Sequence, residues 1–158
     1  MSDRLEGVIR FAIEKEKAAE RYYRDWAARA KDPAVSRMFE ELATEERRHV
    51  ERLDGVSLDD LERSGRAVAD FGLAELMEDV APREDMTVAE ALALAVRREQ
   101  RAIDLYERLR RYATNEEALF DALAAEERRH KHRLELEYAR VVRGHDAALP
   151  DGPASNRL

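Results

Sequence analysis

Cysteine is absent from this chain of 158 residues. Its absence excludes disulfides, thiolate zinc sites, iron–sulfur clusters and a cysteine nucleophile, so oxygen and nitrogen atoms would have to hold any bound metal ion. Long apolar runs are absent as well. The best of them, Ala91–Val96, is far shorter than the roughly 20 residues that cross a membrane, and Met1–Gly7 is charged, without an apolar signal core. We therefore expect a cytoplasmic protein with no membrane partner.

Glycine and proline are scarce, with 6 and 4 copies, whereas alanine, leucine, glutamate and arginine recur throughout the chain. This composition favours long helices over strands and predicts an all-α fold. Basic residues are outnumbered by acidic ones, 28 to 35, which gives a net charge of −7. Such a surface should repel nucleic acid, so we expect no nucleic-acid partner. The length fits one domain.

Apolar residues recur at steps of three and four over four stretches, which is typical of amphipathic helices. The expected helices cover residues 5–30, 33–55, 87–113 and 114–144. Asp32 followed by Pro33 is a typical helix start, and Gly55 is expected to end the second helix. Two capping boxes, each a threonine followed three residues later by a glutamate, are predicted for the third and fourth helices. They are Thr87 with Glu90 and Thr114 with Glu117.

Two segments have a weaker helical pattern or none. Residues 54–86 are expected to form a long crossover, in which residues 57–63 and 73–80 could form short helices. Residues 146–158 have no periodicity and contain two prolines, so they are expected to form a flexible C-terminal tail. The folded domain is therefore predicted to comprise residues 1–145.

The sequence ATEERRH at residues 43–49 returns as AAEERRH at residues 124–130. The helix that precedes each copy also has the same spacing of apolar and polar residues. The chain is thus predicted to contain two repeated helix pairs. Short turns make the helices of each pair antiparallel, and the long crossover can return the chain along the bundle. Together these features predict a four-helix bundle.

Each of the four helical stripes contains polar residues where apolar ones would be expected. They are Glu16 and Tyr23, Glu46 and His49, Glu99 and Tyr106, and Glu127 and His130. A glutamate and a histidine three residues apart share one helix face, with Cβ atoms roughly 5–6 Å apart. Each unpaired buried carboxylate would cost several kcal/mol, unless it is protonated, hydrated or bound to a cation. Two divalent cations would neutralise the four carboxylates, and these donors suit iron, manganese or zinc.

These motifs resemble those of the ferritin-like di-iron proteins, most closely their rubrerythrin-type branch. The resemblance covers residues 9–138 and rests on EKAAERYY from Glu16, EERRH from Glu45, EQRAIDLY from Glu99 and EERRH from Glu126. It implies a ferritin-like four-helix bundle with two iron ions; manganese, a mixed iron and manganese pair, or zinc are alternatives.

The resemblance also implies a role for each residue of the site. Glu16 and Glu99 would be terminal ligands, and Glu46 and Glu127 would bridge the two ions. His49 and His130 would each bind one ion. The hydroxyl groups of Tyr23 and Tyr106 would donate hydrogen bonds that hold the carboxylates in place.

Two features depart from the family pattern. Members that reduce peroxide efficiently usually carry a cysteine-ligated rubredoxin module that supplies electrons. This chain has no cysteine, so an external electron donor would be needed. Peroxidase members also place an additional glutamate where this chain has Ala102. Glu20 could supply an extra oxygen ligand, but a surface salt bridge is the preferred interpretation of this residue.

Three functions are compatible with the sequence. The first is an oxidoreductase, peroxidase or ferroxidase-like, that reacts with peroxide or O2 at a di-iron site. The second is a non-catalytic bundle for iron binding, storage or delivery, and the third is a metal-free bundle with a buried polar network. By the resemblance we expect a homodimer. Glu45, Glu126, His132 and His145 are expected to face solvent, and Trp26, Phe39 and Phe120 are expected in the core.

Overall fold

The computed structural model describes residues 2–56, 82–112 and 116–147 of the chain. These residues form four helices: α1 (Ser2–Arg29), α2 (Pro33–Asp54), α5 (Val88–Tyr112) and α6 (Glu117–Ala147). The described ranges contain no strand. The all-α prediction is therefore confirmed. None of the helices in these ranges is long and apolar enough to cross a membrane.

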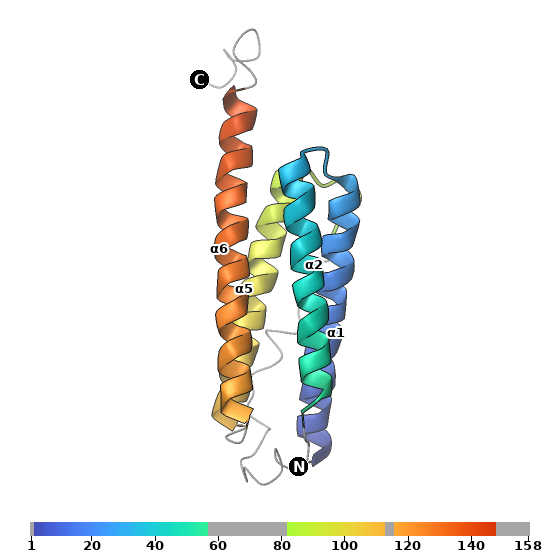
Figure 1. Cartoon of the computed structure of the whole chain (residues 1–158), viewed down its shortest axis with the longest axis vertical. Helices are drawn as coiled ribbons and strands as arrows, with labels where there is room; N and C mark the ends of the chain where they lie inside the picture. The colour runs from blue at the N-terminus through green and yellow to red at the C-terminus, as the bar shows by residue number, and fades with distance from the viewer. Residues whose placement is uncertain (1, 57–81, 113–115, 148–158) are drawn as a thin grey trace.

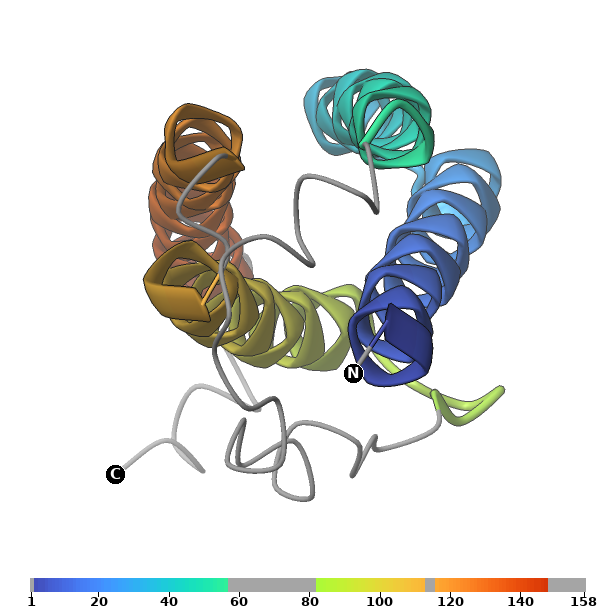
Figure 2. The same cartoon turned by 90° about the horizontal axis from the view of Figure 1, so that it is seen from below.

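The helices form a four-helix bundle made of two antiparallel pairs. α1 packs mainly against α2, and α5 packs mainly against α6. Seen along the bundle, α1 also lies beside α5, and α2 lies beside α6 (Figure 2). α2 ends and α5 begins at opposite ends of the bundle (Figure 1). This arrangement is the one expected for two pairs joined by a crossover; the predicted short helices of the crossover lie outside the described residues.

Local capping explains where two of the helices begin. Asp32 is the N-cap of α2, and its Oδ1 accepts a hydrogen bond from the backbone nitrogen of Ala34 at 2.9 Å. At the start of α5, the Glu90 nitrogen donates to Thr87 Oγ1 at 3.1 Å, and the Thr87 nitrogen donates to Glu90 Oε1 at 3.4 Å. This is the predicted capping box. The second predicted box includes Thr114, which lies outside the described residues.

Replacing the N-cap Asp32 with alanine should lower the free energy of unfolding by about 1 kcal/mol. The Arg140 side chain and the Ala34 amide hold the pKa of Asp32 below its usual range. The contribution of the charged cap should therefore be present at neutral pH and be lost as the pH falls through that lowered pKa. Urea unfolding at several pH values measures this effect. Asp54→Ala, at the exposed far end of the same helix, is the control; an equal loss there would contradict the capping role.

Two hydrophobic clusters fill the bundle on either side of its polar centre. One contains Ile9, Leu53, Tyr106, Leu109 and Phe120, among others, and the second contains Tyr23, Trp26, Phe39, Leu92 and Leu134, among others. The expected core positions of Trp26, Phe39 and Phe120 are confirmed. Both clusters draw residues from α1, α2, α5 and α6, so they hold all four helices against the polar residues between them.

The ends of the first and last helices differ from the sequence prediction. α1 begins at Ser2, and α6 continues through Gly144 to Ala147. A single glycine costs a helix only about 1 kcal/mol relative to alanine, which is not enough to end a long helix. The C-terminal part of α6 extends beyond the other three helices (Figure 1). Residues 146 and 147 therefore belong to α6, and the rest of the expected tail lies outside the described residues.

Candidate metal centre

The polar centre of the bundle consists of six buried side chains, each at most 3% exposed. They are Glu16 of α1, Glu46 and His49 of α2, Glu99 of α5, and Glu127 and His130 of α6. The structure thus brings together all six residues that the sequence suggested as ligands. Their role as metal ligands is still a prediction.

The histidines and the glutamates without a neighbouring histidine lie on opposite sides of the centre, because they come from different helices of each pair. α2 and α6 each contribute a glutamate and a histidine three residues apart, which share one helix face. α1 and α5 each contribute a single glutamate. Because α2 lies beside α6 and α1 lies beside α5 (Figure 2), both imidazoles are on one side and both single carboxylates are on the other. The imidazole rings are stacked, with centroids 5.6 Å apart.

The six side chains form two groups that could each hold one metal ion. The first group is Glu16, Glu46, His49 and Glu127, and the second is Glu46, Glu99, Glu127 and His130. Within each group the ligand atoms lie within 4.8 Å of one another. Glu46 and Glu127 belong to both groups, so each has its two oxygens available to two ions. This sharing is the geometry that a pair of bridged metal ions requires.

Distances from the imidazoles support this grouping. His49 Nδ1 lies 2.8 Å from Glu127 Oε1, 3.4 Å from Glu46 Oε2 and 3.5 Å from Glu16 Oε2. His130 Nδ1 lies 3.0 Å from Glu46 Oε1, 3.3 Å from Glu127 Oε2 and 3.7 Å from Glu99 Oε1. In both histidines it is therefore Nδ1 that faces the carboxylates.

Several polar atoms of the centre are buried without a hydrogen-bond partner, because the short distances between His49 Nδ1 and the carboxylates do not have hydrogen-bond geometry. They are Glu16 Oε2, His49 Nδ1, Glu99 Oε2 and both carboxylate oxygens of Glu127. A buried polar atom without a partner costs roughly 1–3 kcal/mol, and more when it is charged. Divalent cations would satisfy these oxygen and nitrogen donors together, and the donor set suits iron, manganese or zinc. The residues present therefore fit a pair of metal ions.

Two tyrosines contact the single glutamates, each from the opposite helix. Tyr23 of α1 donates a hydrogen bond to Glu99 Oε1 of α5 at 2.5 Å, and Tyr106 of α5 donates one to Glu16 Oε1 of α1. Burial raises the pKa of both phenols, and the neighbouring carboxylates raise it further. Both hydroxyls therefore keep their protons and hold one oxygen of each carboxylate. The other oxygen of Glu16 and of Glu99 has no hydrogen-bond partner.

Glu45 and Glu126 were expected from the sequence to face solvent, but each contacts a histidine of the centre. Glu45 of α2 contacts Nε2 of His130 on α6, and Glu126 of α6 lies 3.3 Å from Nε2 of His49 on α2. Both side chains are only partly exposed. Each carboxylate can accept the Nε2 proton of the histidine on the opposite helix, which leaves Nδ1 available to a metal ion. The arrangement depends on how α2 packs against α6. The available sequence signal was that Glu45 and Glu126 each directly precede an inward-facing glutamate.

Removing Glu45 or Glu126 should weaken metal binding without unfolding the bundle. Loss of a carboxylate that orients a ligating histidine typically costs 10- to 100-fold in metal affinity. We expect a decrease of about that size for Glu45→Ala and for Glu126→Ala, measured by competition with a chelator of known affinity. Glu51→Ala removes an exposed carboxylate of α2 and should leave the affinity unchanged. Equal affinities in all three variants would contradict the orienting role.

In the metal-free centre, the pKa values of the shared glutamates, Glu46 and Glu127, differ from those of the single glutamates, Glu16 and Glu99, each of which belongs to one group only. Burial and the charge of Glu16 raise the pKa of Glu46 and Glu127 well above the usual range. Burial also opposes ionisation of Glu16, but its contacts with Glu46 and His49 and the hydrogen bond from Tyr106 outweigh this and lower its pKa to about 2. Burial lowers the pKa of each histidine, and the contacting carboxylates outweigh this and raise it. Without metal, the shared glutamates therefore hold protons that a cation must displace.

Two other predictions concern residues near the centre. Glu20 lies 3.2 Å from Arg24 and belongs to neither metal group, in agreement with the salt bridge that was preferred for it. His132 is exposed, as expected. The side chain of His145 lies outside the described residues.

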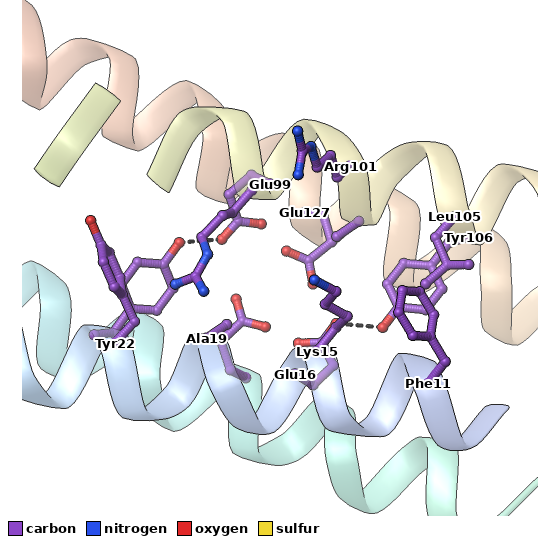
Figure 3. Close-up of a pocket in the computed structure, with 14 residues that line it drawn as sticks. Phe11, Lys15, Glu16, Ala19, Tyr22, Glu99, Arg101, Leu105, Tyr106 and Glu127 are labelled. Atoms are coloured by element: carbon purple, nitrogen blue, oxygen red, sulfur yellow. Dashed lines mark hydrogen bonds between the residues drawn. The ribbon is translucent and has the colours of Figure 1, made fainter. Parts of the chain in front are cut away.

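A pocket reaches the centre between α1 and α5. Figure 3 shows Glu16 on α1 and Glu99 and Glu127 on the facing side, with Phe11, Ala19 and Leu105 among the surrounding residues. Glu46 also lines the pocket, whereas neither histidine does. The four carboxylates are therefore accessible from the side of the bundle opposite the imidazoles.

Comparison with known proteins was consistent with this geometry. The family model described as Rubrerythrin matches residues 7–138, a range that includes all six residues of the centre. No match was found among curated proteins or among solved structures. The match covers most of the chain and agrees with a ferritin-like four-helix bundle. The chain therefore belongs to the rubrerythrin family.

Proposed function

We propose that the chain is a di-iron redox protein that reduces peroxide or O2 at the centre formed by its four helices. The main support is that Glu46 and Glu127 belong to both metal groups. A bridged pair of irons would supply two electrons to one substrate, one from each ion, whereas a metal-free polar network would supply none. Reduction of hydrogen peroxide would consume two electrons and two protons and yield two molecules of water.

Each set of residues at the site would have a different role. The four glutamates would neutralise two divalent cations, and His49 and His130 would complete the ligand sets from α2 and α6. Tyr23 and Tyr106 would keep Glu99 and Glu16 in position. The two hydrophobic clusters would limit the access of water from either end of the bundle. The iron pair, when bound, would supply the redox chemistry.

We further propose that the electrons come from an external donor. The chain has no cysteine, so it cannot itself form the cysteine-ligated iron centre that supplies electrons in related proteins. Iron is the proposed metal because members of this family usually bind two iron ions. Manganese, a mixed iron and manganese pair, or zinc would bind to the same oxygen and nitrogen donors.

The decisive experiment combines metal content with turnover. Protein loaded anaerobically with Fe(II) should retain about two irons per chain, as the two groups imply. Addition of peroxide should then oxidise the iron, and an added reductant should sustain many turnovers. Oxidation without turnover, with many irons retained per assembly, would instead indicate storage. A folded chain that stays empty of metal would contradict the proposal and favour the metal-free network.

A further inference from the structure

The internal repeat gives α2 and α6 an equivalent arginine after each histidine of the centre. Arg52 follows His49 by three residues, and Arg133 follows His130 by three residues. Residues three apart share one helix face, so each arginine lies on the same side of its helix as the histidine before it. Because α2 lies beside α6 (Figure 2), a symmetric arrangement would bring each arginine to the carboxylate that contacts that histidine.

Arg52 makes this contact. Its Nη1 donates a hydrogen bond to Glu126 Oε2 at 2.5 Å. The same oxygen lies 3.3 Å from His49 Nε2, slightly beyond the usual range of about 2.7–3.2 Å for such a hydrogen bond. Arg129 lies farther away, with its Nη2 3.9 Å from Glu126 Oε1. Glu126 is therefore held closely by Arg52 and more loosely by His49.

Arg133 has a different partner. Its guanidinium forms an ion pair with Glu41 of α2. The position of the repeat that corresponds to Glu41 is Ala122 on α6, and the methyl group of an alanine cannot attract Arg52. One difference between the two halves thus leaves Arg52 with Glu126 and draws Arg133 toward Glu41.

The two histidines of the centre therefore have unequal support. His130 Nε2 forms a hydrogen bond with Glu45, whereas the carboxylate beside His49 is shared with a cation. A carboxylate that accepts the proton of a ligating imidazole makes the ring a stronger donor to the metal ion. A hydrogen bond from an arginine offsets part of the carboxylate's charge. Glu126 should therefore support His49 less strongly than Glu45 supports His130.

We propose that Arg52 makes the two metal positions unequal, so that the first group, which contains His49, binds its ion more weakly and is filled last. The inference rests on the proposed function and adds a form of regulation to it. At limiting iron the chain would hold one ion, in the group that contains His130. Reduction of a substrate by two electrons would begin only when iron is abundant enough to fill the group with His49.

Variants with one histidine isolate each metal position. His130→Ala retains the complete first group, and His49→Ala retains the complete second group. Their affinity for Fe(II) is measured anaerobically by competition with a chelator. We expect His49→Ala to bind Fe(II) about three- to tenfold more tightly than His130→Ala, as is typical of interactions within one polar network.

Removing Arg52 should strengthen the weaker position. Arg52→Met should raise the Fe(II) affinity of His130→Ala by about three- to tenfold and leave that of His49→Ala unchanged. A purely structural role of Arg52 would lower the affinity instead. Arg47→Met is the matched control, because it removes the same charge from an exposed position of α2, 3.7 Å from Glu51, and should change neither affinity.

A double-mutant cycle tests whether Arg52 acts through Glu126 rather than through its charge at a distance. When Glu126→Ala is added to His130→Ala, Arg52→Met should have no further effect on the affinity for Fe(II).

Glu41→Ala is the reciprocal test. It releases Arg133, which can then engage Glu45, so it should lower the Fe(II) affinity of His49→Ala. Both helices would then carry the same arrangement of arginine, glutamate and histidine.

Thermal unfolding is recorded for every variant. If a chain with one histidine does not fold, Arg52→Met is tested in the chain with both, where the weaker of the two stepwise binding constants should approach the stronger. An affinity that falls or stays the same in Arg52→Met, or a gain that persists with Glu126→Ala, would overturn the inference alone. A folded wild-type chain that binds no iron would overturn the proposed function and the inference together.

Discussion

Replacing Glu46 by alanine is expected to remove both metal ions, so that the metal content falls from about two per chain to nearly none. Glu46 belongs to both groups of ligands, and so does Glu127. Loss of either shared carboxylate leaves each ion one ligand short and also removes the negative charge between the two ions. Metal analysis of protein loaded anaerobically with Fe(II) measures the effect, and Glu127→Ala should give the same result.

The single glutamates should behave differently from the shared ones. Glu16 belongs to one group and Glu99 to the other, so Glu16→Ala should weaken one position more than the other and leave about one ion per chain. Glu51→Ala, at an exposed position of α2, should leave both metal ions bound. If Glu16→Ala and Glu46→Ala lose the same amount of metal, the two ions do not share Glu46 in the way that the structure indicates.

Metal loading is expected to raise the unfolding temperature by about 8–16 °C. A ligand that binds only the folded state at about 1,000 times its dissociation constant stabilises that state by about 4 kcal/mol. Each kcal/mol shifts the midpoint by roughly 2–4 °C in a chain of this size. Differential scanning calorimetry of metal-free and Fe(II)-loaded protein under anaerobic conditions measures the difference.

This stabilisation should shrink as the pH falls. The pKa values of Glu46 and Glu127 are raised in the metal-free protein, by burial and by the charge of Glu16, so both carboxyls hold protons at a pH where ordinary glutamates are ionised. Metal binding must release these protons, so affinity falls with decreasing pH. The unfolding temperature of the Glu46→Ala variant should not depend on metal at any pH. An identical unfolding temperature with and without metal in the wild-type chain would favour the metal-free network.

Much of this structure could be predicted from sequence because its determinants are local. The helices follow from apolar residues at steps of three and four, and Asp32 and the Thr87–Glu90 box start helices where predicted. The six central residues were recognisable because each interrupts an apolar stripe. A polar residue on an inward helix face must be buried wherever the helix packs, so its burial did not depend on knowing the exact arrangement of the bundle.

Features that depend on contacts between helices were not predictable in the same way. The contacts of Glu45 and Glu126 with His130 and His49 require the particular approach of α2 to α6. The pocket depends similarly on the approach of α1 to α5. The end of α6 was misplaced for another reason: Gly144 is a helix-ending signal in many sequences, but here it is one unfavourable residue in a helix of 31 residues.

Each half of the chain completes the site of the other half. Tyr23 in the first half holds Glu99 in the second, and Tyr106 in the second holds Glu16 in the first. Glu45 and Glu126 make the reciprocal connections between α2 and α6. The helical hairpins α1–α2 and α5–α6 can each form from local contacts, but neither contains a complete group of ligands. During folding, tight metal binding would therefore report the docking of the two hairpins rather than the formation of either one.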